Sequence, residues 1–204
     1  DWAATAGAWI IEDDYDSEFR YASRPLTALQ GLDGGDRVIY CGTMSKVLFP
    51  ALRIGHLIVP PALVEAFTAA RYLAGVQQPL RDHPVPADFT DEGHFERHVR
   101  RMRVLYRERR DALIEAVKSA LGDLVTLGPS EGGMHMVMWL PEDIDAREVQ
   151  RRAAQRGIDT IPVSAFAIER DPGPGLVLGY AHLDAARIRA ACRELACAIE
   201  DAAR

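Results

Sequence analysis

A lysine beside two hydroxyl residues is the clearest candidate for chemistry in this sequence. Residues 42–46 read Gly-Thr-Met-Ser-Lys, and Arg53 follows Lys46 seven positions later. The amine of Lys46 could form an imine with an aldehyde, while hydroxyls and a guanidinium could hold a phosphate. These are the groups that an enzyme using pyridoxal 5′-phosphate (PLP) needs. Taken alone, the segment is also consistent with an ordinary polar turn, because short motifs have many chance matches.

An acidic stretch upstream offers groups that could hold the ring of such a cofactor. The apolar residues 8–11 stop at residues 12–16, Glu-Asp-Asp-Tyr-Asp, as a buried parallel strand would at its carboxyl end. Ligands of open α/β sheets bind at that edge. Asp13 could pair with the pyridine nitrogen and keep it protonated, and Tyr15 could hydrogen-bond the 3-oxygen. The alternative is a turn of solvated carboxylates, an interpretation that we keep for the other acids of the stretch: Asp14, Asp16 and Glu18.

Apolar runs predict an α/β sheet that would position both sets of groups. Three short runs predict buried strands, and they cover residues 8–11, 38–42 and 54–59. A helix is expected over residues 60–75, entered through a proline pair and ended near a glycine. Prolines break the periodicity afterwards, so we expect a loop or hinge over residues 78–90. These elements predict one domain over residues 1–90.

The remaining residues, 91–204, predict a smaller α+β domain. A helix over residues 91–121 has apolar residues at a helical period, and a helix this long usually bridges two subdomains. Two more helices are expected over residues 145–156 and 184–203. The predicted strands form a mainly antiparallel sheet with helices on one face. They cover residues 123–127, 134–140, 159–163 and 176–180.

Composition excludes several classes of function for this chain. With 204 residues, 48% of them hydrophobic, the chain can form a substantial core. A net charge of −6 argues against a nucleic-acid footprint on this stretch, which would need clustered lysine and arginine. No apolar run is long enough to cross a bilayer and the first residues lack a signal peptide, so we expect a cytoplasmic protein without a membrane partner. The three cysteines have no C-x-x-C spacing and predict neither disulfides nor a zinc site.

Three segments carry a resemblance to a known family: residues 11–19, 38–55 and 92–103. They resemble the aminotransferase-like domain of MocR-type transcriptional regulators of the GntR superfamily, which is similar to class I/II aminotransferases of PLP fold type I. The resemblance implies a partial large domain over residues 1–90, with a mainly parallel sheet, followed by a bridging helix and a small C-terminal domain. It also implies a role for each candidate residue. Lys46 would be the catalytic residue that forms the internal aldimine, Asp13 would bind the pyridine nitrogen, Tyr15 the 3-oxygen, and Thr43, Ser45 and Arg53 the phosphate.

The resemblance further implies partners and a mode of action. Such regulators have an N-terminal winged-helix domain that binds DNA, and most are dimers with the active site at the subunit interface. Their PLP domain senses an amine or amino acid, which would displace Lys46 from the cofactor. In this chain we expect the winged helix, the glycine-rich phosphate loop and the ring-stacking aromatic to be absent, because the chain starts inside the large domain.

One departure from the family pattern bears on the ligand. Aminotransferases of this fold usually place an arginine near residues 176–180 to grip the substrate carboxylate, and the candidate position here is Val177. An apolar residue cannot make that bidentate contact. Val177 therefore favours sensing over transamination of amino acids. The proline-containing residues 83–86 are a second departure, since relatives usually look helical there.

Other interpretations remain open at this stage. The chain could be an active aminotransferase in which Lys46 moves a proton, or a structural module without PLP. His94 and His98 have a helical spacing that could serve a metal, although a helix start with solvated histidines fits better. The arginines of residues 97–110 are better explained by a solvated helix than by a nucleic-acid contact. For Cys41 we expect a buried, inert thiol.

Overall fold

A computed structural model describes residues 1–21, 26–34, 36–75 and 84–203. The chain divides into two compact units. Unit 1 comprises residues 1–18 and 23–101, and unit 2 comprises residues 19–22 and 102–204. The predicted domain division after residue 90 stays a prediction. None of the helices in the described ranges is long and apolar enough to span a membrane.

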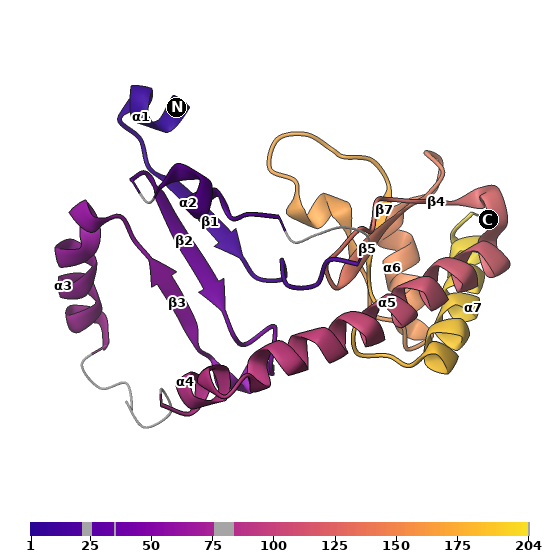
Figure 1. The fold of residues 1–204 in the computed structure, drawn as a ribbon. Coiled ribbons are helices and arrows are strands. Elements are labelled where there is room, and N and C mark those ends of the chain that lie inside the picture. Colours follow the sequence, from indigo (N-terminus) through magenta and orange to yellow (C-terminus); the bar gives the residue numbers. More distant parts are fainter. Residues whose placement is uncertain (22–25, 35, 76–83, 204) are drawn as a thin grey trace. The chain divides into compact units, whose positions relative to one another are not determined.

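A mixed sheet forms the centre of unit 1 (Figure 1). Strand β1 (Ile10–Asp14) pairs in parallel with β2 (Val38–Thr43), and β3 (Gly55–Ile58) pairs with β2 in the antiparallel sense. The three strands lie near their predicted places. The predicted α/β class is confirmed and the sheet is mixed: the β1–β2 pairing is parallel, as expected, and the β2–β3 pairing is antiparallel. The short connection after β2 turns the chain directly back along the same strand, and such a short link cannot form a parallel crossover.

Strand β1 extends further than its apolar run. We predicted that the strand stops before Glu12, but the ladder continues through Asp14, which pairs with Gly42. Backbone hydrogen bonds to β2 therefore hold the acidic residues in extended conformation. The expected burial is also wrong in part: Val38 and Ile39 are buried, whereas all four residues of the edge strand β3 are exposed.

Several helices of unit 1 precede or follow these strands along the chain. The short helices α1 (Trp2–Ala6) and α2 (Leu29–Asp33) precede β2, and the predicted helix after the proline pair is found as η2 (Pro61–Leu63) and α3 (Val64–Gly75). Residues 84–90 were expected in a loop and instead belong to the helix α4 (Pro84–Asp91). Proline is tolerated in the first helical turn, where its missing N–H has no intrahelical partner. The rest of the predicted loop, before residue 84, lies outside the described residues.

A long helix, α5 (His94–Leu121), begins after Gly93 and runs for 28 residues. This confirms the long helix predicted from periodicity, with its start three residues later. The helix begins in unit 1 and continues into unit 2 from Met102 onward.

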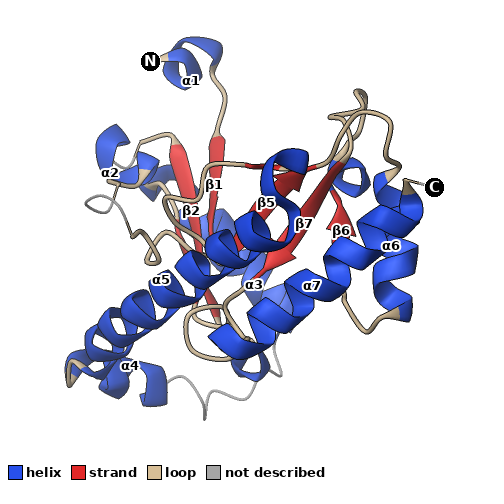
Figure 2. Cartoon of the chain, turned by 90° about the vertical axis from the view of Figure 1, so that its right-hand side faces the viewer, coloured by secondary structure: helices blue, strands red, loops and turns tan. Residues whose placement is uncertain are grey.

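Unit 2 contains an antiparallel sheet covered by two helices (Figure 2). The strand order is β4-β5-β7-β6, with β5 (His135–Trp139) and β7 (Gly175–Gly179) in the centre. Helices α6 (Ala146–Gln155) and α7 (Ala185–Ala202) pack side by side, and Asp145 and Asp184 cap their first turns by accepting from backbone N–H groups. The large, fully buried side chains of this unit include Met136, Met138, Val149, Leu176, Tyr180 and Ile199.

The edge strands of this sheet are shorter than predicted. Strand β4 (Thr126–Leu127) is preceded by the 3₁₀ turn η4 (Gly122–Leu124), and β6 (Ile161–Pro162) is followed by η5 (Val163–Phe166). Proline has no N–H to donate to a ladder, which limits the extent of β6. The type and order of the predicted elements in residues 123–203 are otherwise confirmed.

A short upstream segment also belongs to unit 2. The Phe19 side chain is fully buried, and its ring meets Tyr106 edge to face with 4.9 Å between centroids. Gly133 N–H donates to the Phe19 carbonyl at 2.9 Å, and Tyr21 N–H donates to Glu131 O at 2.9 Å. The chain therefore enters unit 2 once at residues 19–22, long before α5 enters it again.

Candidate functional site

The carboxyl ends of β1 and β2 lie at the same edge of the unit 1 sheet, because the two strands are parallel. Asp13 is in register with Cys41, and Thr43 is the last residue of β2. Side chains alternate between the faces of a sheet, so Asp13, Cys41 and Thr43 share one face. Glu12, Asp14 and the β2 residue Tyr40 share the other. The structure thus brings together Asp13 and Thr43 from segments 30 residues apart in the sequence.

The acids on either side of Asp13 are tied into the fold. Glu12 accepts from the backbone N–H groups of Leu29 and Gln30, at 2.9 and 3.1 Å, and so holds the start of α2. Asp14 accepts from both the N–H and the hydroxyl of Ser17, at 3.1 and 2.6 Å. Asp14 also accepts from the Tyr40 hydroxyl at 2.9 Å. The interpretation of Asp14 as a merely solvated carboxylate is therefore wrong.

The Tyr40 phenol links β2 to the end of β1. Burial raises its pKa, and the hydrogen bond to Asp14 raises the pKa further. A raised pKa keeps the phenol protonated, so it remains a donor to the Asp14 carboxylate. No local sequence pattern predicts this contact, because it depends on the register between the two strands.

Tyr15 follows β1 directly and its side chain is exposed. Neighbouring Asp16 raises the Tyr15 pKa most, followed by burial and by Asp13. The phenol is therefore protonated at neutral pH and can donate a hydrogen bond. The influence of Asp13 on Tyr15 is consistent with the two side chains lying near the same strand end.

The segment that carries Lys46 is held by hydrogen bonds on both sides. Thr43 Oγ1 donates to the Ile54 carbonyl at 3.2 Å and accepts from Ser45 N–H at 3.1 Å. Met44 N–H donates to Ile54 O at 3.0 Å, and Leu48 N–H donates back to Met44 O at 2.8 Å. Within this turn the Lys46 side chain is exposed, whereas neighbouring Val47 is buried.

Arg53 has an unusual backbone conformation. It follows η1 (Pro50–Leu52) with φ of 50°, the one positive φ among the non-glycine residues of the described ranges. A non-glycine residue in the left-handed region carries a conformational cost, and such residues cluster at functional sites. The turn at Arg53 leads the chain into β3, whose Gly55 pairs with Thr43. Arg53 therefore lies in the segment that links β2 to β3, which is the segment that also carries Lys46.

The chemical groups of this edge fit the cofactor that the sequence suggested. A carboxylate and a protonated phenol suit the polar positions of a pyridinol ring, while a guanidinium and a hydroxyl suit a phosphate. Lys46 would supply the amine. A hydroxyl has one proton, and the proton of Thr43 goes to Ile54 O, so Thr43 would have to turn to donate to a phosphate. Ser45 and Arg53 are the more available donors.

Cys41 was expected to be a buried, inert thiol, and the structure adds its position. The residue is half-buried on the face shared by Asp13 and Thr43. Burial raises its pKa, and the Asp13 charge raises it further, so the thiol is protonated at neutral pH. Sequence reasoning missed that Cys41 lies directly beside Asp13. The strand period could have shown this once the register was known.

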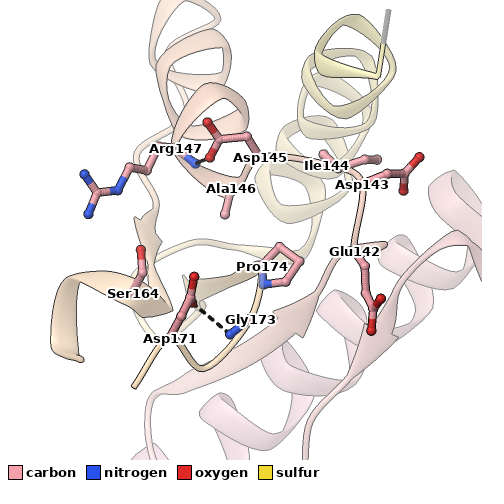
Figure 3. A pocket seen from close by; sticks show the side chains of 10 residues that line it. All are labelled: Glu142, Asp143, Ile144, Asp145, Ala146, Arg147, Ser164, Asp171, Gly173 and Pro174. Atoms are coloured by element: carbon pink, nitrogen blue, oxygen red, sulfur yellow. Dashed lines mark hydrogen bonds between the residues drawn. The ribbon is translucent and has the colours of Figure 1, made fainter. Parts of the chain in front are cut away.

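A separate hollow lies in unit 2 and contains none of the predicted site residues (Figure 3). Its volume is about 480 Å³, and it lies at the start of α6. Four carboxylates and one guanidinium line it, which makes it unsuited to a phosphate. Two of these carboxylates are engaged with backbone N–H groups: Asp145 with Arg147 at 2.9 Å and Asp171 with Gly173 at 3.0 Å. The charged lining residues are Glu142, Asp143, Asp145, Asp171 and Arg147.

The two histidines at the start of α5 have different partners. His94 contacts Glu92 and Arg97, whereas His98 Nε2 lies 2.9 Å from the carbonyl oxygen of Val47. No cluster of three or more metal-ligating side chains occurs in the described part of the chain. The contact of His98 was not predicted from the sequence.

Residues 2–195 match the family model of class I and II aminotransferases. The chain belongs to this family. The cofactor of this family is pyridoxal 5′-phosphate, and the fold of the chain is that of PLP-dependent transferases of fold type I. The recognition made from the three sequence segments is confirmed at this level.

Individual relatives include both regulators and enzymes. The chain is 39% identical to the uncharacterized HTH-type transcriptional regulator YhdI of Bacillus subtilis, over 95% of this chain and 41% of that protein. It is 40% identical to the probable rhizopine catabolism regulatory protein MocR of Rhizobium meliloti, over 89% and 37%. The crystal structure of LysN, an α-aminoadipate aminotransferase from Thermus thermophilus complexed with N-(5′-phosphopyridoxyl)-L-leucine, matches with a TM-score of 0.89 at 28% identity. That match covers 98% of this chain and 52% of LysN. The chain thus spans between 37% and 52% of the length of these three relatives.

Proposed function

We propose that this chain is the lysine-bearing part of a PLP-binding effector domain in a GntR/MocR-type transcriptional regulator. The observation that supports the proposal is the parallel pairing of β1 with β2, which puts Asp13 and Thr43 on one face at the same edge of the sheet. Tyr15 follows β1 directly, and the segment with Lys46 and Arg53 follows β2. Two relatives that match most of the chain are named as regulators, which supports this reading.

Each residue of the edge has a distinct task in this proposal. PLP, when bound, supplies an aldehyde for a covalent bond to an amine and a ring that withdraws electrons. Lys46 provides that amine. The Asp13 carboxylate accepts a hydrogen bond from the protonated pyridine nitrogen, and the protonated Tyr15 donates one to the ring oxygen. Ser45 and Arg53 bind the phosphate, with Thr43 shaping the turn.

The ligand sensed by such a domain is a small amine or amino acid. It would compete with Lys46 for the covalent bond, and the change would bias a DNA-binding domain in the intact protein. Val177, in the centre of β7, pairs with Val137 and Ile161 on the two neighbouring strands. These apolar residues offer no cation for a carboxylate, which favours an amine effector over turnover of α-amino acids. DNA binding through a separate domain and homodimerisation belong to the same proposal.

An active aminotransferase is the second candidate, supported by the similarity to LysN. In that case the freed Lys46 amine would also carry a proton between two carbon atoms during each turnover. The two candidates differ in a direct measurement. An enzyme converts an added amino acid into its oxo acid in many turnovers, whereas a regulator changes its affinity for operator DNA without net product.

Borohydride reduction tests the cofactor assignment. Lys46 and Lys118 are the two lysines of this chain, which provides an internal control. The intact protein is incubated with PLP, reduced and mapped by peptide mass spectrometry. We expect the pyridoxyl label on Lys46, its loss in Lys46→Ala, and its retention in Lys118→Ala. Label on Lys118, or none in the chain, would contradict the proposal.

A further inference from the structure

A histidine of α5 contacts the turn that carries Lys46. His98 Nε2 lies 2.9 Å from the carbonyl oxygen of Val47, the residue directly after the lysine. We propose that His98 is a positioning residue for Lys46: it fixes the lysine turn against α5 and thereby sets how firmly the cofactor is retained. The cofactor part of this inference rests on the proposed function, while the positioning of the turn does not.

The chemistry of the contact defines which imidazole nitrogen carries the proton. A carbonyl oxygen can only accept, so Nε2 of His98 must be the donor. The Nδ1 nitrogen is not needed for this bond. The geometry therefore points to the Nε2–H form of the ring in the folded protein.

The surroundings of the contact favour a persistent hydrogen bond. Val47 is 1% exposed and Val99, the neighbour of His98 on α5, is 5% exposed. His98 itself is half-buried. A hydrogen bond beside buried apolar groups is stronger than one in water, and its loss leaves a poorly solvated carbonyl.

The hydrogen bond from His98 can affect Lys46 because it is made to Val47, the next residue in the turn. Hydrogen bonds from Met44 to Ile54 and from Leu48 to Met44 hold the two flanks of the turn. The bond from His98 attaches at Val47, between those flanks and next to Lys46. Loss of this bond would free the backbone at the lysine while β2 and β3 remain paired.

Side-chain geometry allows a sharp choice of variants. The amide nitrogen of glutamine can take the place of Nε2, whereas that of asparagine corresponds to Nδ1 and falls short. His98→Gln should therefore keep the bond, and His98→Asn and His98→Ala should lose it. His94→Ala is the matched control, because His94 lies one turn earlier on α5 and contacts Glu92 and Arg97.

Two measurements on the intact protein test the inference. The first is amide hydrogen exchange at Leu48 in the cofactor-free protein, which reports on the turn without PLP. The second is the rate at which bound PLP is lost on dilution. We expect both rates to rise about fivefold in His98→Ala and His98→Asn, equivalent to about 1 kcal/mol for one hydrogen bond. His98→Gln and His94→Ala should match the wild type.

The outcomes separate the possible failures. If the wild type retains no PLP but Leu48 exchange follows the expected order of variants, the cofactor proposal fails and the positioning of the turn stands. If His98→Asn behaves like His98→Gln, or if His98→Ala lowers only the melting temperature, the positioning role is overturned. A ¹⁵N spectrum that shows the proton on Nδ1 would overturn it as well.

Discussion

The three consecutive carboxylates of β1 have different surroundings because successive side chains of a strand point to opposite faces. Glu12 and Asp14 lie on one face and bind backbone and hydroxyl donors. Asp13 lies on the other, beside Cys41. The first and third acids therefore stabilise the strand end, and the middle one is available to a ligand.

Asp13→Asn should separate cofactor binding from folding. An amide cannot hold the pyridine nitrogen as a charged pair, so we expect the affinity for PLP to fall about tenfold or more. The free energy of unfolding of the cofactor-free protein should change by less than about 0.5 kcal/mol, since Asp13 is exposed. Titration with PLP and urea denaturation measure the two effects.

Glu12→Gln is the control for this variant. It weakens the bonds to the start of α2 and should lower the free energy of unfolding by about 1 kcal/mol. If Asp13→Asn bound PLP as tightly as the wild type, Asp13 would not be a cofactor-binding residue.

At the scale of single residues, the sequence identified the candidate cofactor-binding residues but not the hydrogen bonds that hold the segments around them. The acidic stretch after the apolar run and the hydroxyl-rich turn were recognisable because each is local. The bond between Tyr40 and Asp14, and the bond of His98 to a residue 51 positions away, depend on strand register and on the placement of α5. Neither the register nor that placement follows from local spacing.

Secondary-structure elements were predictable where periodicity is long. The 28 residues of α5 were found from the apolar period, and α6 and α7 also lie within the ranges where helices were predicted. The prolines of α4 misled the prediction, because a proline ends a helix from inside but is accepted in its first turn. The edge strands β4 and β6 were predicted too long, because the predicted ranges included residues of the adjoining 3₁₀ turns η4 and η5.

Helix α6 contains a charge cluster with a defined pH response. Glu148 accepts from Arg151 and Arg152, with the shortest contacts at 2.6 Å, and these bonds lower the Glu148 pKa from 4.5 to about 2. A lowered pKa in the folded state means that the stabilisation is present above pH 4.5 and is lost as the pH falls toward 2.

Glu148→Gln should therefore lower the melting temperature at pH 7 but not near pH 2. The difference from the wild type should shrink steadily between pH 4.5 and pH 2, and thermal melts followed by circular dichroism would show this. Both arginines are partly exposed, so the effect at pH 7 is small and should weaken in high salt. A difference that is constant with pH would exclude the ionised pair as its cause.

At the scale of the whole molecule, the two units share one chain that enters unit 2 twice. Phe19 fills a fully buried position in unit 2, although most residues around it in the sequence belong to unit 1. A deletion of the ring leaves a cavity against Tyr106 and removes apolar contacts from that core.

Phe19→Ala should lower the free energy of unfolding by about 3 to 5 kcal/mol, the usual cost of removing a buried aromatic ring. Urea denaturation of the intact protein measures the loss. Phe166→Ala is the control, because Phe166 also belongs to unit 2 and is 65% exposed. Equal effects of the two substitutions would show that Phe19 is not a core residue.

Unit 2 is assembled from two separate stretches of sequence, residues 19–22 and 102–204. Phe19, whose ring is fully buried there, comes from the first stretch. A fragment that starts at Met102 would lack this ring, so unit 2 excised by itself should unfold more easily than unit 2 with its upstream stretch attached.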